Sequence, residues 1–576
     1  MERLLIRGGT VLDGSGGEPF VADVLVRNGL IAEVAPDIRV PVGQEIDARG
    51  LLVTPGFVDV HTHYDGQATW EHTLRPSSEH GVTTVVMGNC GVGFAPCRRE
   101  GRDDLVRLME GIEDIPEIVM TTGLPWAWKT FPDYLDFLGA RSFDVDVAAQ
   151  IPHAALRVFV MGRRGMERAP ATHEDLREMR DLAREAIEAG ALGFSTSRSV
   201  NHKTVAGDHT PSFEAAEREL HAIASGVGDA NKGVLQVITD FPSVDDVPDR
   251  MRLLIELSRQ SGRPLSFTLA QFHSAPRSWE RALALLEQAH AEGVPIKGQV
   301  FPRPMGMVMS LETTRNPFTG SATYNSLLVL PFDARLEAMK RDDIRGRIIQ
   351  EARALQQQAK QRRFDLVFPL RQAADYEPRM SDSVASQAAR RGVAPDVLAY
   401  DMLLGNGGRG MLWAAFANII DGSLDPVLRM MRSAATIIGL GDGGAHYGLI
   451  CDASFPTFML SYWGRDRIRG ERLPLSRIVK SLSRDTAAAV GLHDRGLIAP
   501  GWKADINVLD FDALRVNVPT VRYDLPGGGR RLTQSAEGYR ATVVSGRVTY
   551  RDGKATGALP GRLVRGPQTV SACPAN

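Results

Sequence analysis

The sequence predicts an α/β fold in which a barrel of alternating strands and helices forms the middle of the chain and a small β module is built from both ends. Strand-like apolar runs alternate with helix-like runs between residues 55 and 496, which is typical of βαβ units and a parallel sheet. Short strands separated by glycine turns occur before residue 54 and again after residue 497. We therefore expect the chain to divide into residues 1–54, 55–496 and 497–576.

The composition is that of an ordinary globular protein. Hydrophobic residues make up 43% of the 576 residues and charged residues 24%, which excludes a mainly disordered chain. The net charge of −2 gives no electrostatic reason to expect nucleic acid or an anionic membrane as partner. A small-molecule substrate is the more natural expectation, and a homo-oligomer is an open one.

The start of the chain and its cysteines suggest a cytoplasmic protein. Met1 to Arg7 runs directly into a glycine turn, so there is no apolar stretch suited to a signal peptide. No apolar run is long enough to span a bilayer. Four cysteines at wide, irregular spacing do not form a disulfide framework, and a cytosol keeps them reduced: Cys90, Cys97, Cys451 and Cys573.

The expected β module draws strands from both termini. Near the N-terminus, Leu30 to Val34 follows Asn28-Gly29, a dipeptide suited to a type I′ hairpin because both central residues take positive φ. Further strands are expected at residues 4–6, 11–12 and 23–26, and, after Gly491, at residues 504–509, 540–544 and 547–550. Each set alone has too little core, so we expect one sandwich.

The barrel region offers nine candidate strands, at least one of which must lie outside a regular eight-stranded barrel. They cover residues 57–60, 83–87, 145–150, 156–161, 193–195, 234–238, 265–269, 296–300 and 437–441. The clearest helix runs from Glu174 to Ala189, where apolar residues follow the 3.6-residue period, with Thr172 as N-cap and Gly190 as its end.

A helical insertion is expected between the seventh and eighth strands. The segment from about Phe332 to Arg391 is richer in charge and in glutamine than its surroundings. Either a structural role or a lid over the site would suit it.

The first chemical signal is His61-Thr62-His63, directly after the apolar run Phe57 to Val60. In a strand the side chains alternate between the two faces, so His61 and His63 point to the same side. Neutral imidazole is the commonest protein ligand for zinc, and two imidazoles on one strand are already oriented for a divalent ion. Two surface histidines at a strand exit are the alternative.

Cys90 and Asp442 supply two further candidate ligands. Cys90 ends the second barrel strand among glycines, where a thiolate could bind zinc, although an inert buried cysteine would look the same. Asp442 follows an apolar strand within Gly441-Asp442-Gly443 and could ligate a metal, or be a turn residue. In barrels of alternating strands and helices the site lies at the carboxyl ends of the strands, where these residues and the two histidines would meet.

These motifs resemble the amidohydrolase superfamily and, within it, the N-acyl-D-amino-acid deacylase (D-aminoacylase) branch. The similarity covers most of the chain and is weakest in the middle and in the helical insertion. The motifs that carry it are Pro55 to His63, Gly81 to Thr84, Gly88 to Gly91, Gly190 to Ser197, Gly441 to Gly443, and Arg495 to Asp505.

The resemblance implies a TIM-like (β/α)8 barrel with a small β-sandwich domain formed from both chain termini. It also implies amide hydrolysis by a metal-activated hydroxide. His61, His63 and Asp442 match the first-metal positions of the family, and Cys90 matches the cysteine that bridges metals in this branch. Asp442 would take a proton from water and deliver it to the leaving nitrogen.

One departure from the family concerns the number of metal ions. Relatives supply histidines from the fifth and sixth strands, but residues 233–240 and 264–271 contain none. We therefore expect a single Zn²⁺, or another divalent ion, instead of two. His153, His202, His209 and His273 are candidate replacements, and each could equally be a substrate contact, a surface residue or a core histidine.

Candidate substrate contacts follow the same strand ends. Arg198 could pair with a substrate carboxylate, His202 could contact the substrate, and Tyr64 could donate to an oxyanion or merely pack. The favoured function is hydrolysis of an N-acyl-D-amino acid. The alternatives are hydrolysis of a cyclic amide or another small-molecule C–N bond, and a non-hydrolytic barrel that keeps only a binding role.

Overall fold

A parallel sheet of eight strands forms the centre of the molecule. The computed structural model describes residues 3–359, 364–370 and 375–570. In sheet order the strands are β6 (Phe57–Asp59), β7 (Val82–Met87), β8 (Asp146–Pro152), β9 (Gly193–Ser197), β10 (Val234–Ile238), β11 (Leu265–Thr268), β12 (Ile296–Val300) and β16 (Thr436–Ile438). Their near-continuous apolar composition is typical of strands covered on both faces.

The first and last strands of this sheet meet just beyond their carboxyl ends. Thr62 and Gly443 form a parallel bridge, and the His63 amide donates to the Gly443 carbonyl over 2.7 Å. Gly443 is required here, because a Cβ atom would lie 2.4 Å from the Ser77 hydroxyl oxygen. The sheet therefore curls into the expected α/β barrel.

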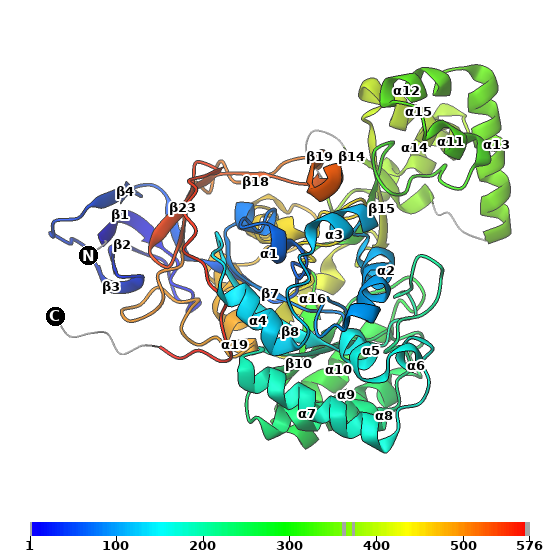
Figure 1. Ribbon diagram of the computed structural model, residues 1–576. Helices are drawn as coiled ribbons and strands as arrows, with labels where there is room; N and C mark the ends of the chain where they lie inside the picture. The colour runs from blue at the N-terminus through cyan, green and yellow to red at the C-terminus, as the bar shows by residue number, and fades with distance from the viewer. Residues whose placement is uncertain (1–2, 360–363, 371–374, 571–576) are drawn as a thin grey trace.

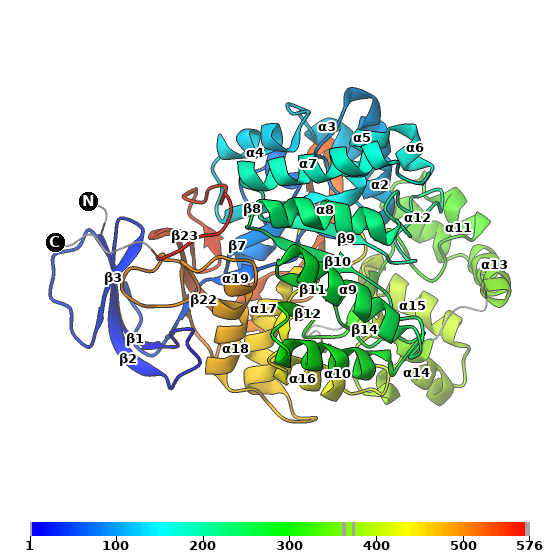
Figure 2. The ribbon, with the colours of Figure 1, turned by 90° about the horizontal axis from the view of Figure 1, so that it is seen from below.

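Helices cover the outer face of the sheet (Figures 1 and 2). The ring comprises α2 (Arg102–Glu113), α4 (Phe131–Gly139), α5 (His153–Met161), α7 (His173–Ala189), α8 (Glu217–Asp229), α9 (Val247–Ser261), α10 (Ser278–Ala291), α16 (Asp425–Arg432), α18 (Leu475–Leu482) and α19 (Arg484–Ala489). Shorter helices are α1 (Gln67–Trp70), α3 (Glu117–Gly123), α6 (Arg163–Met166) and α17 (Phe455–Phe458).

Helix α7 confirms the predicted helix and both of its caps. The Thr172 hydroxyl accepts from the Asp175 amide, and the Asp175 side chain accepts from the Thr172 amide, which completes a capping box. Gly190 ends the helix at φ 115°, a conformation that glycine adopts without a Cβ clash.

The predicted strand at residues 156–161 is wrong, because these residues belong to α5. The preceding strand β8 ends at Pro152, and α5 begins at the next residue. Nearly every residue of α5 is buried, and residues 156–161 are apolar except for Arg157. A short, mostly apolar run of that kind does not distinguish a strand from a helix. Removing this segment leaves the eight strands of the barrel.

A second sheet joins the two ends of the chain. It combines β1 (Arg3–Val11), β2 (Phe20–Arg27), β3 (Leu30–Ala35), β4 (Gln44–Asp47) and β5 (Leu52–Pro55) with β17 (Ile506–Leu509), β22 (Tyr539–Val544), β23 (Arg547–Arg551) and β24 (Lys554–Ala555). The antiparallel pair β5 and β17 connects the two halves, which share a core around Val53, Ile506 and Val543. The domain boundaries at residues 54 and 496 stay a prediction.

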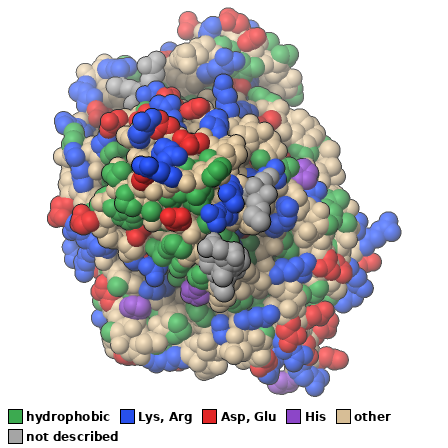
Figure 3. Space-filling view, turned by 90° about the vertical axis from the view of Figure 1, so that its left-hand side faces the viewer, with side chains coloured by type: hydrophobic (Ala, Val, Ile, Leu, Met, Phe, Trp, Pro, Cys, Tyr) green, Lys and Arg blue, Asp and Glu red, His purple; other side chains and the backbone are tan. Residues whose placement is uncertain are grey.

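Seen from the side of this second sheet, the surface carries basic and acidic side chains intermixed with apolar ones (Figure 3). The remaining small strands form two ribbons that lie over the barrel: β18 (Arg515–Val516) with β21 (Ala536–Glu537), and β19 (Thr520–Leu525) with β20 (Gly529–Thr533).

The helical insertion lies between β12 and β16, as expected, but it is longer than residues 332–391. It contains β13 (Met305–Met309), α11 (Ala322–Leu327), α12 (Phe332–Met339), α13 (Asp342–Ala359), β14 (Val367–Leu370), α14 (Val384–Arg391), α15 (Pro395–Gly408) and β15 (Met411–Ala417). Its helices pack around their own core, which includes Phe318, Ile348 and Leu403, and form a separate lobe in Figure 1. Residues 360–363 and 371–374 of the expected insertion lie outside the described residues.

Cys90, Cys97 and Cys451 are buried free thiols, whereas Cys573 lies outside the described residues. Within the described part of the chain, no helix combines the length and the apolar character of a membrane span.

Candidate metal centre

His61 and His63 project from the carboxyl end of β6 toward the barrel interior. Both side chains are completely buried, and their ring centroids lie 5.6 Å apart. Thr62 between them points the other way and donates its hydroxyl to the Val86 carbonyl over 2.8 Å. The strand alternation thus brings two imidazoles to one side, at the end of the barrel where Asp442 leaves β16.

Four predicted ligands converge at this point. The Nε2 atom of His61 lies 3.3 Å from Cys90 Sγ and 3.3 Å from Asp442 Oδ1. The Nε2 atom of His63 lies 3.6 Å from the same Asp442 oxygen. Zinc–nitrogen bonds of roughly 2.0–2.1 Å put neighbouring ligands of a tetrahedral site about 3.4 Å apart, so these separations suit a shared cation.

A glutamine fixes the orientation of the His61 ring. Gln299 donates through Nε2 to the Ser266 hydroxyl over 2.8 Å, which leaves its Oε1 to accept from Nδ1 of His61, also at 2.8 Å. With the proton on Nδ1, Nε2 of His61 carries the lone pair that faces Cys90 and Asp442. His61 is therefore held in the tautomer that a metal ligand needs.

The structure adds Glu113, which the sequence analysis did not identify. Its carboxylate is 1% exposed, and Oε2 lies 3.5 Å from Nε2 of both His63 and His446. Among the described residues, neither carboxylate oxygen of Glu113 and neither ring nitrogen of His63 has a hydrogen-bond partner. Buried polar atoms without partners mark places where an ion or water belongs. The sequence signal that could have identified Glu113 is an acidic residue directly after the apolar positions of α2.

The electrostatics of the cluster favour a cation. Burial lowers the pKa of His61 and His63, so both rings are neutral, as ligands must be. Burial raises the pKa of Cys90 and Glu113 well above their usual range, and the nearby carboxylates add to both shifts. Burial also acts to raise the pKa of Asp442, but the His63 imidazole, whose Nε2 lies 3.6 Å from Oδ1, and the neighbouring imidazoles of His61 and His446 outweigh it and hold that pKa well below its usual range.

Several residues of the cluster adopt strained backbone conformations. The φ angles are 56° at Cys90, 47° at Asp442 and 52° at His446, in the left-handed region that non-glycine residues seldom occupy. Such strain persists where the surrounding structure imposes it, and it concentrates at functional sites. The backbone beside Asp442 is closely packed, since a Cβ atom at Gly441 would lie 2.3 Å from an Asp59 carboxylate oxygen.

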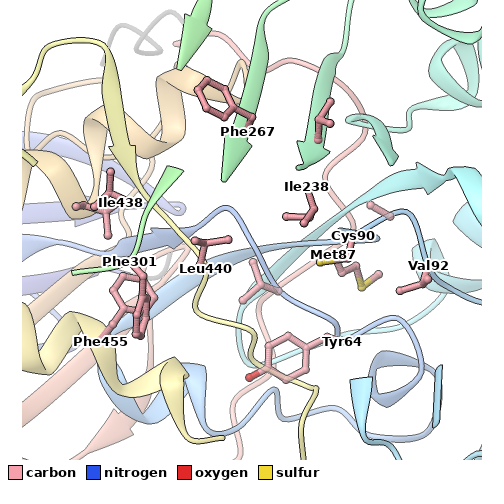
Figure 4. Packing of buried hydrophobic residues seen from close by; sticks show 14 of the residues in the cluster. Tyr64, Met87, Cys90, Val92, Ile238, Phe267, Phe301, Ile438, Leu440 and Phe455 are labelled. Atoms are coloured by element: carbon pink, nitrogen blue, oxygen red, sulfur yellow. The ribbon is translucent and has the colours of Figure 1, made fainter. Parts of the chain in front are cut away.

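Tyr64, for which an oxyanion contact and simple packing were both open, is packed and hydrogen-bonded inside the protein. Its hydroxyl donates to the Ser77 hydroxyl over 2.8 Å and accepts from the Ser77 amide over 3.1 Å. The ring is completely buried and belongs to the apolar core that also contains Met87, Cys90 and Leu440 (Figure 4). Its hydrogen-bonding capacity is already used inside the protein.

Arg198, the second candidate substrate contact, has a hydrogen-bond partner within the protein. Its guanidinium donates to the Ala215 carbonyl over 2.9 Å and lies in a surface cavity that Glu217 and Arg250 also line. The strand β9 ends before Arg198, and the following loop carries the side chain toward α8 and α9. The pairing of Arg198 with a substrate carboxylate stays a prediction.

His202 does lie near the cluster. Its Nδ1 shares a 2.8 Å hydrogen bond with the Ser197 hydroxyl at the end of β9. Burial, together with the nearby His446, His63 and His61, lowers its pKa to about 3, although Asp442 opposes the shift. At neutral pH the His202 ring is uncharged.

The other candidate histidines have partners elsewhere. His153 is hydrogen-bonded to Thr196 and Glu219, and His209 stacks on Phe213 at a centroid distance of 4.0 Å. The donor group around His61 contains neither of them, nor His273. In β10 the interior position is taken by Gln236, whose Oε1 accepts from the Cys90 amide over 3.2 Å.

Comparisons with known proteins agree with this architecture. A sequence profile described as the amidohydrolase family matches residues 44–550. The D-aminoacylase of Alcaligenes xylosoxydans xylosoxydans is 27% identical over 570 residues, covering 97% of both chains. The N-acyl-D-glutamate deacylase of the same organism is 30% identical over 309 residues, covering 52% of this chain and 57% of the relative.

Two solved structures share the fold over nearly the whole chain. A D-aminoacylase with a binuclear metal centre superposes with a TM-score of 0.65 at 23% identity, covering 98% of this chain and 99% of that one. The N-acyl-D-glutamate deacylase from Bordetella bronchiseptica, complexed with zinc and a phosphonate inhibitor, superposes with a TM-score of 0.63 at 23% identity and the same coverage. At this identity the likeness establishes the fold alone.

Proposed function

Because this chain belongs to the amidohydrolase family and is a hydrolase of carbon–nitrogen bonds other than peptide bonds, we propose that it hydrolyses N-acyl-D-amino acids to a D-amino acid and a carboxylate. The relatives named D-aminoacylase and N-acyl-D-glutamate deacylase support this substrate class. The observation that carries the proposal is the convergence of His61, His63 and Asp442, with donor atoms 3.3 and 3.6 Å apart, at one end of the barrel.

The residues present fit a divalent cation, and we propose that it is one Zn²⁺. His61 and His63 would hold it through Nε2, with Asp442 and Cys90 as further ligands, because their donor atoms face one another without completing a hydrogen-bond network. When bound, such a cation supplies Lewis acidity toward a substrate carbonyl and toward water. One ion per chain would differ from the binuclear centre of the D-aminoacylase described above.

Asp442 is the proposed acid–base residue. Its depressed pKa keeps the carboxylate ionised at neutral pH, so it can accept a proton from the attacking water. The water oxygen forms a bond to the acyl carbon, and the C–N bond then breaks. Asp442 returns the proton to the leaving nitrogen, so the products are a carboxylate and the free amine of the amino acid. Its side chain is 14% exposed, which places it at the open side of the cluster.

His202 is the proposed substrate contact. The ring is neutral and its Nδ1 is held by Ser197, so the opposite ring nitrogen is available as a hydrogen-bond partner for a polar group of the substrate. A neutral imidazole does not form an ion pair with a carboxylate, so His202 would orient the substrate by hydrogen bonding.

The test combines metal analysis with a substrate panel. The purified protein is assayed against N-acyl-D- and N-acyl-L-amino acids, with acyl-D-methionine and acyl-D-glutamate included, before and after treatment with a chelator. We expect hydrolysis of D-substrates, loss of activity without metal, recovery with Zn²⁺, and about one metal ion per chain. Turnover of cyclic amides with inert acyl amino acids would refute the substrate class, and two tightly bound ions would refute the single-ion centre.

A further inference from the structure

The end of helix α2 brings Glu113 to the metal centre from outside the barrel strands. Asp114, which follows it in a left-handed conformation at φ 50°, accepts from the Gly448 amide over 2.9 Å and from the Thr314 hydroxyl over 3.2 Å. The backbone carbonyl of Glu113 itself accepts from the His446 amide. These contacts fix the helix end against the loop that follows β16, which is the loop that carries Asp442.

The carboxylate of Glu113 lies in surroundings that do not neutralise it. It is 1% exposed, and within the described residues both of its oxygens lack a hydrogen-bond partner. The charged groups that act on it are Asp442 and Asp65, which are acidic as well. Burying a carboxylate costs so much free energy that the group is protonated, given a partner or bound to a metal ion. The cluster therefore has an excess of acidic groups that a divalent cation would balance.

The distances around Glu113 distinguish ligation from hydrogen bonding. Its Oε2 lies 3.5 Å from Nε2 of His63 and 3.5 Å from Nε2 of His446. A protonated carboxyl group that donated its O–H to either ring would come within roughly 2.5–3.0 Å. Ligands of one tetrahedral zinc ion are instead about 3.4 Å apart. The same spacing recurs between His63 and Asp442, at 3.6 Å.

We propose that Glu113 is a direct ligand of the cation that His61 and His63 bind. Its carboxylate would be a fifth donor beside His61, His63, Asp442 and Cys90, in a position for which β10 and β11 supply no histidine, and the coordination shell of zinc can expand from four ligands to five. His446, on the far side of the carboxylate, positions Glu113 through the backbone hydrogen bond and the ring contact. The inference rests on the metal-dependent centre of the proposed function, and it adds a ligand from a helix to a donor set otherwise supplied by strand ends.

A direct measurement of metal affinity tests this proposal without reference to activity. The full chain is freed of metal with a chelator, and the Kd for Zn²⁺ is determined by competition with a chromophoric chelator for the wild type, Glu113→Gln, Glu110→Gln and His63→Asn. Visible absorption of the Co²⁺ form reports the ligand set of the same four proteins. Glu110 is the matched control, since it lies one turn earlier in α2 and is less buried.

We expect Glu113→Gln to weaken Zn²⁺ binding by at least about 10-fold, a loss that even indirect partners of metal ligands produce. It should also change the Co²⁺ spectrum, whereas Glu110→Gln should leave both unchanged. His63→Asn should abolish tight binding.

Wild-type affinity and an unchanged Co²⁺ spectrum in Glu113→Gln would overturn the proposal. If Glu113→Gln bound Zn²⁺ like the wild type but His63→Asn did not bind it, only the ligand role of Glu113 would be refuted. The metal centre and the proposed function would be unaffected. A wild type that binds no Zn²⁺ would overturn both. Failure of Glu113→Gln to fold would also count against ligation, because a carboxylate needed for folding would have to be a partner inside the apoprotein.

Discussion

Asp442 and His61 are joined by two contacts across the closure of the barrel. The amide of Asp442 donates to the His61 carbonyl over 3.0 Å, and Oδ1 of Asp442 lies 3.3 Å from Nε2 of His61. The first contact links the first and last barrel strands, and the second belongs to the metal centre. The geometry of the candidate ligands therefore depends on the same backbone pairing that closes the barrel.

Replacing Asp442 by asparagine should lower kcat by a factor of about 10² to 10⁴, the usual contribution of a positioned acid–base group. The amide keeps the size of the side chain but can neither accept the proton from water nor return it to nitrogen. Steady-state kinetics on the best acyl-D-amino acid measures the effect. Far-UV circular dichroism should match the wild type, and unchanged turnover would remove Asp442 from the mechanism.

Replacing Gln299 by methionine should weaken Zn²⁺ binding by about 10- to 100-fold, because His61 loses the acceptor that keeps its proton on Nδ1. Methionine has a similar shape but does not provide a comparable acceptor. The Kd from chelator competition measures the change. Ser266→Ala is the graded control, since it removes only the acceptor that orients Gln299, and a larger loss in Ser266→Ala than in Gln299→Met would contradict this account.

Acid stability should depend on His80, which is buried and neutral. Its ring hydrogen-bonds to the Thr457 hydroxyl and the Gln534 carbonyl, each at 2.7 Å. Burial lowers its pKa to about 4, the nearby Arg303 also lowers it, and the bond to Gln534 opposes both. The unfolded state, with a pKa of about 6.5, therefore binds the proton first as the pH falls.

The free energy of unfolding should therefore fall by about 3 kcal/mol because of His80 as the pH decreases from about 6.5 to about 4, with little further loss below pH 4. Urea unfolding at a series of pH values measures it as the difference between the wild type and His80→Gln, which cannot titrate. If the two proteins lost stability in parallel over this range, His80 would not be the group responsible.

Replacing Arg495 by methionine should reduce the free energy of unfolding by about 3 kcal/mol, since it leaves a buried carboxylate with one cationic partner fewer. Arg495 donates to Asp146 and to Thr84, each over 2.8 Å, and so ties the segment before β17 to the base of the barrel. Lys503, 3.1 Å from Asp146, remains as a partner, which keeps the loss at the lower end.

The matched control for Arg495 is Arg163→Met, which breaks an exposed pair with Glu167 and should cost less than about 1 kcal/mol. Urea unfolding of the three proteins under the same conditions compares them. Equal losses in the two variants would show that the buried pair contributes no more than a surface one.

The predictable part of the fold came from local patterns. The period of α7, with its Thr172 and Gly190 caps, lies within one element and needed no partner to be recognised. Pattern analysis gave the wrong element at residues 156–161, because a helix that is buried on nearly all sides lacks the periodicity that distinguishes a helix from a strand. For Arg198 and Tyr64 the sequence left alternatives open, because whether a polar side chain faces the site depends on loop paths and on partners that lie elsewhere in the chain.

By itself the sequence determined the strand-borne part of the candidate centre, because alternation along β6 puts His61 and His63 on one side and strand ends in a barrel lie at one rim. Only the tertiary structure shows that the Glu113 carboxylate lies beside them, 3.5 Å from Nε2 of His63. Its position depends on the closing of α2 against the loop after β16, and no spacing in the chain encodes the distance between a helix end and a strand end. Candidate ligands that local periodicity places together can therefore be predicted from the sequence. A candidate ligand that is brought in by packing between distant segments is found only in the structure.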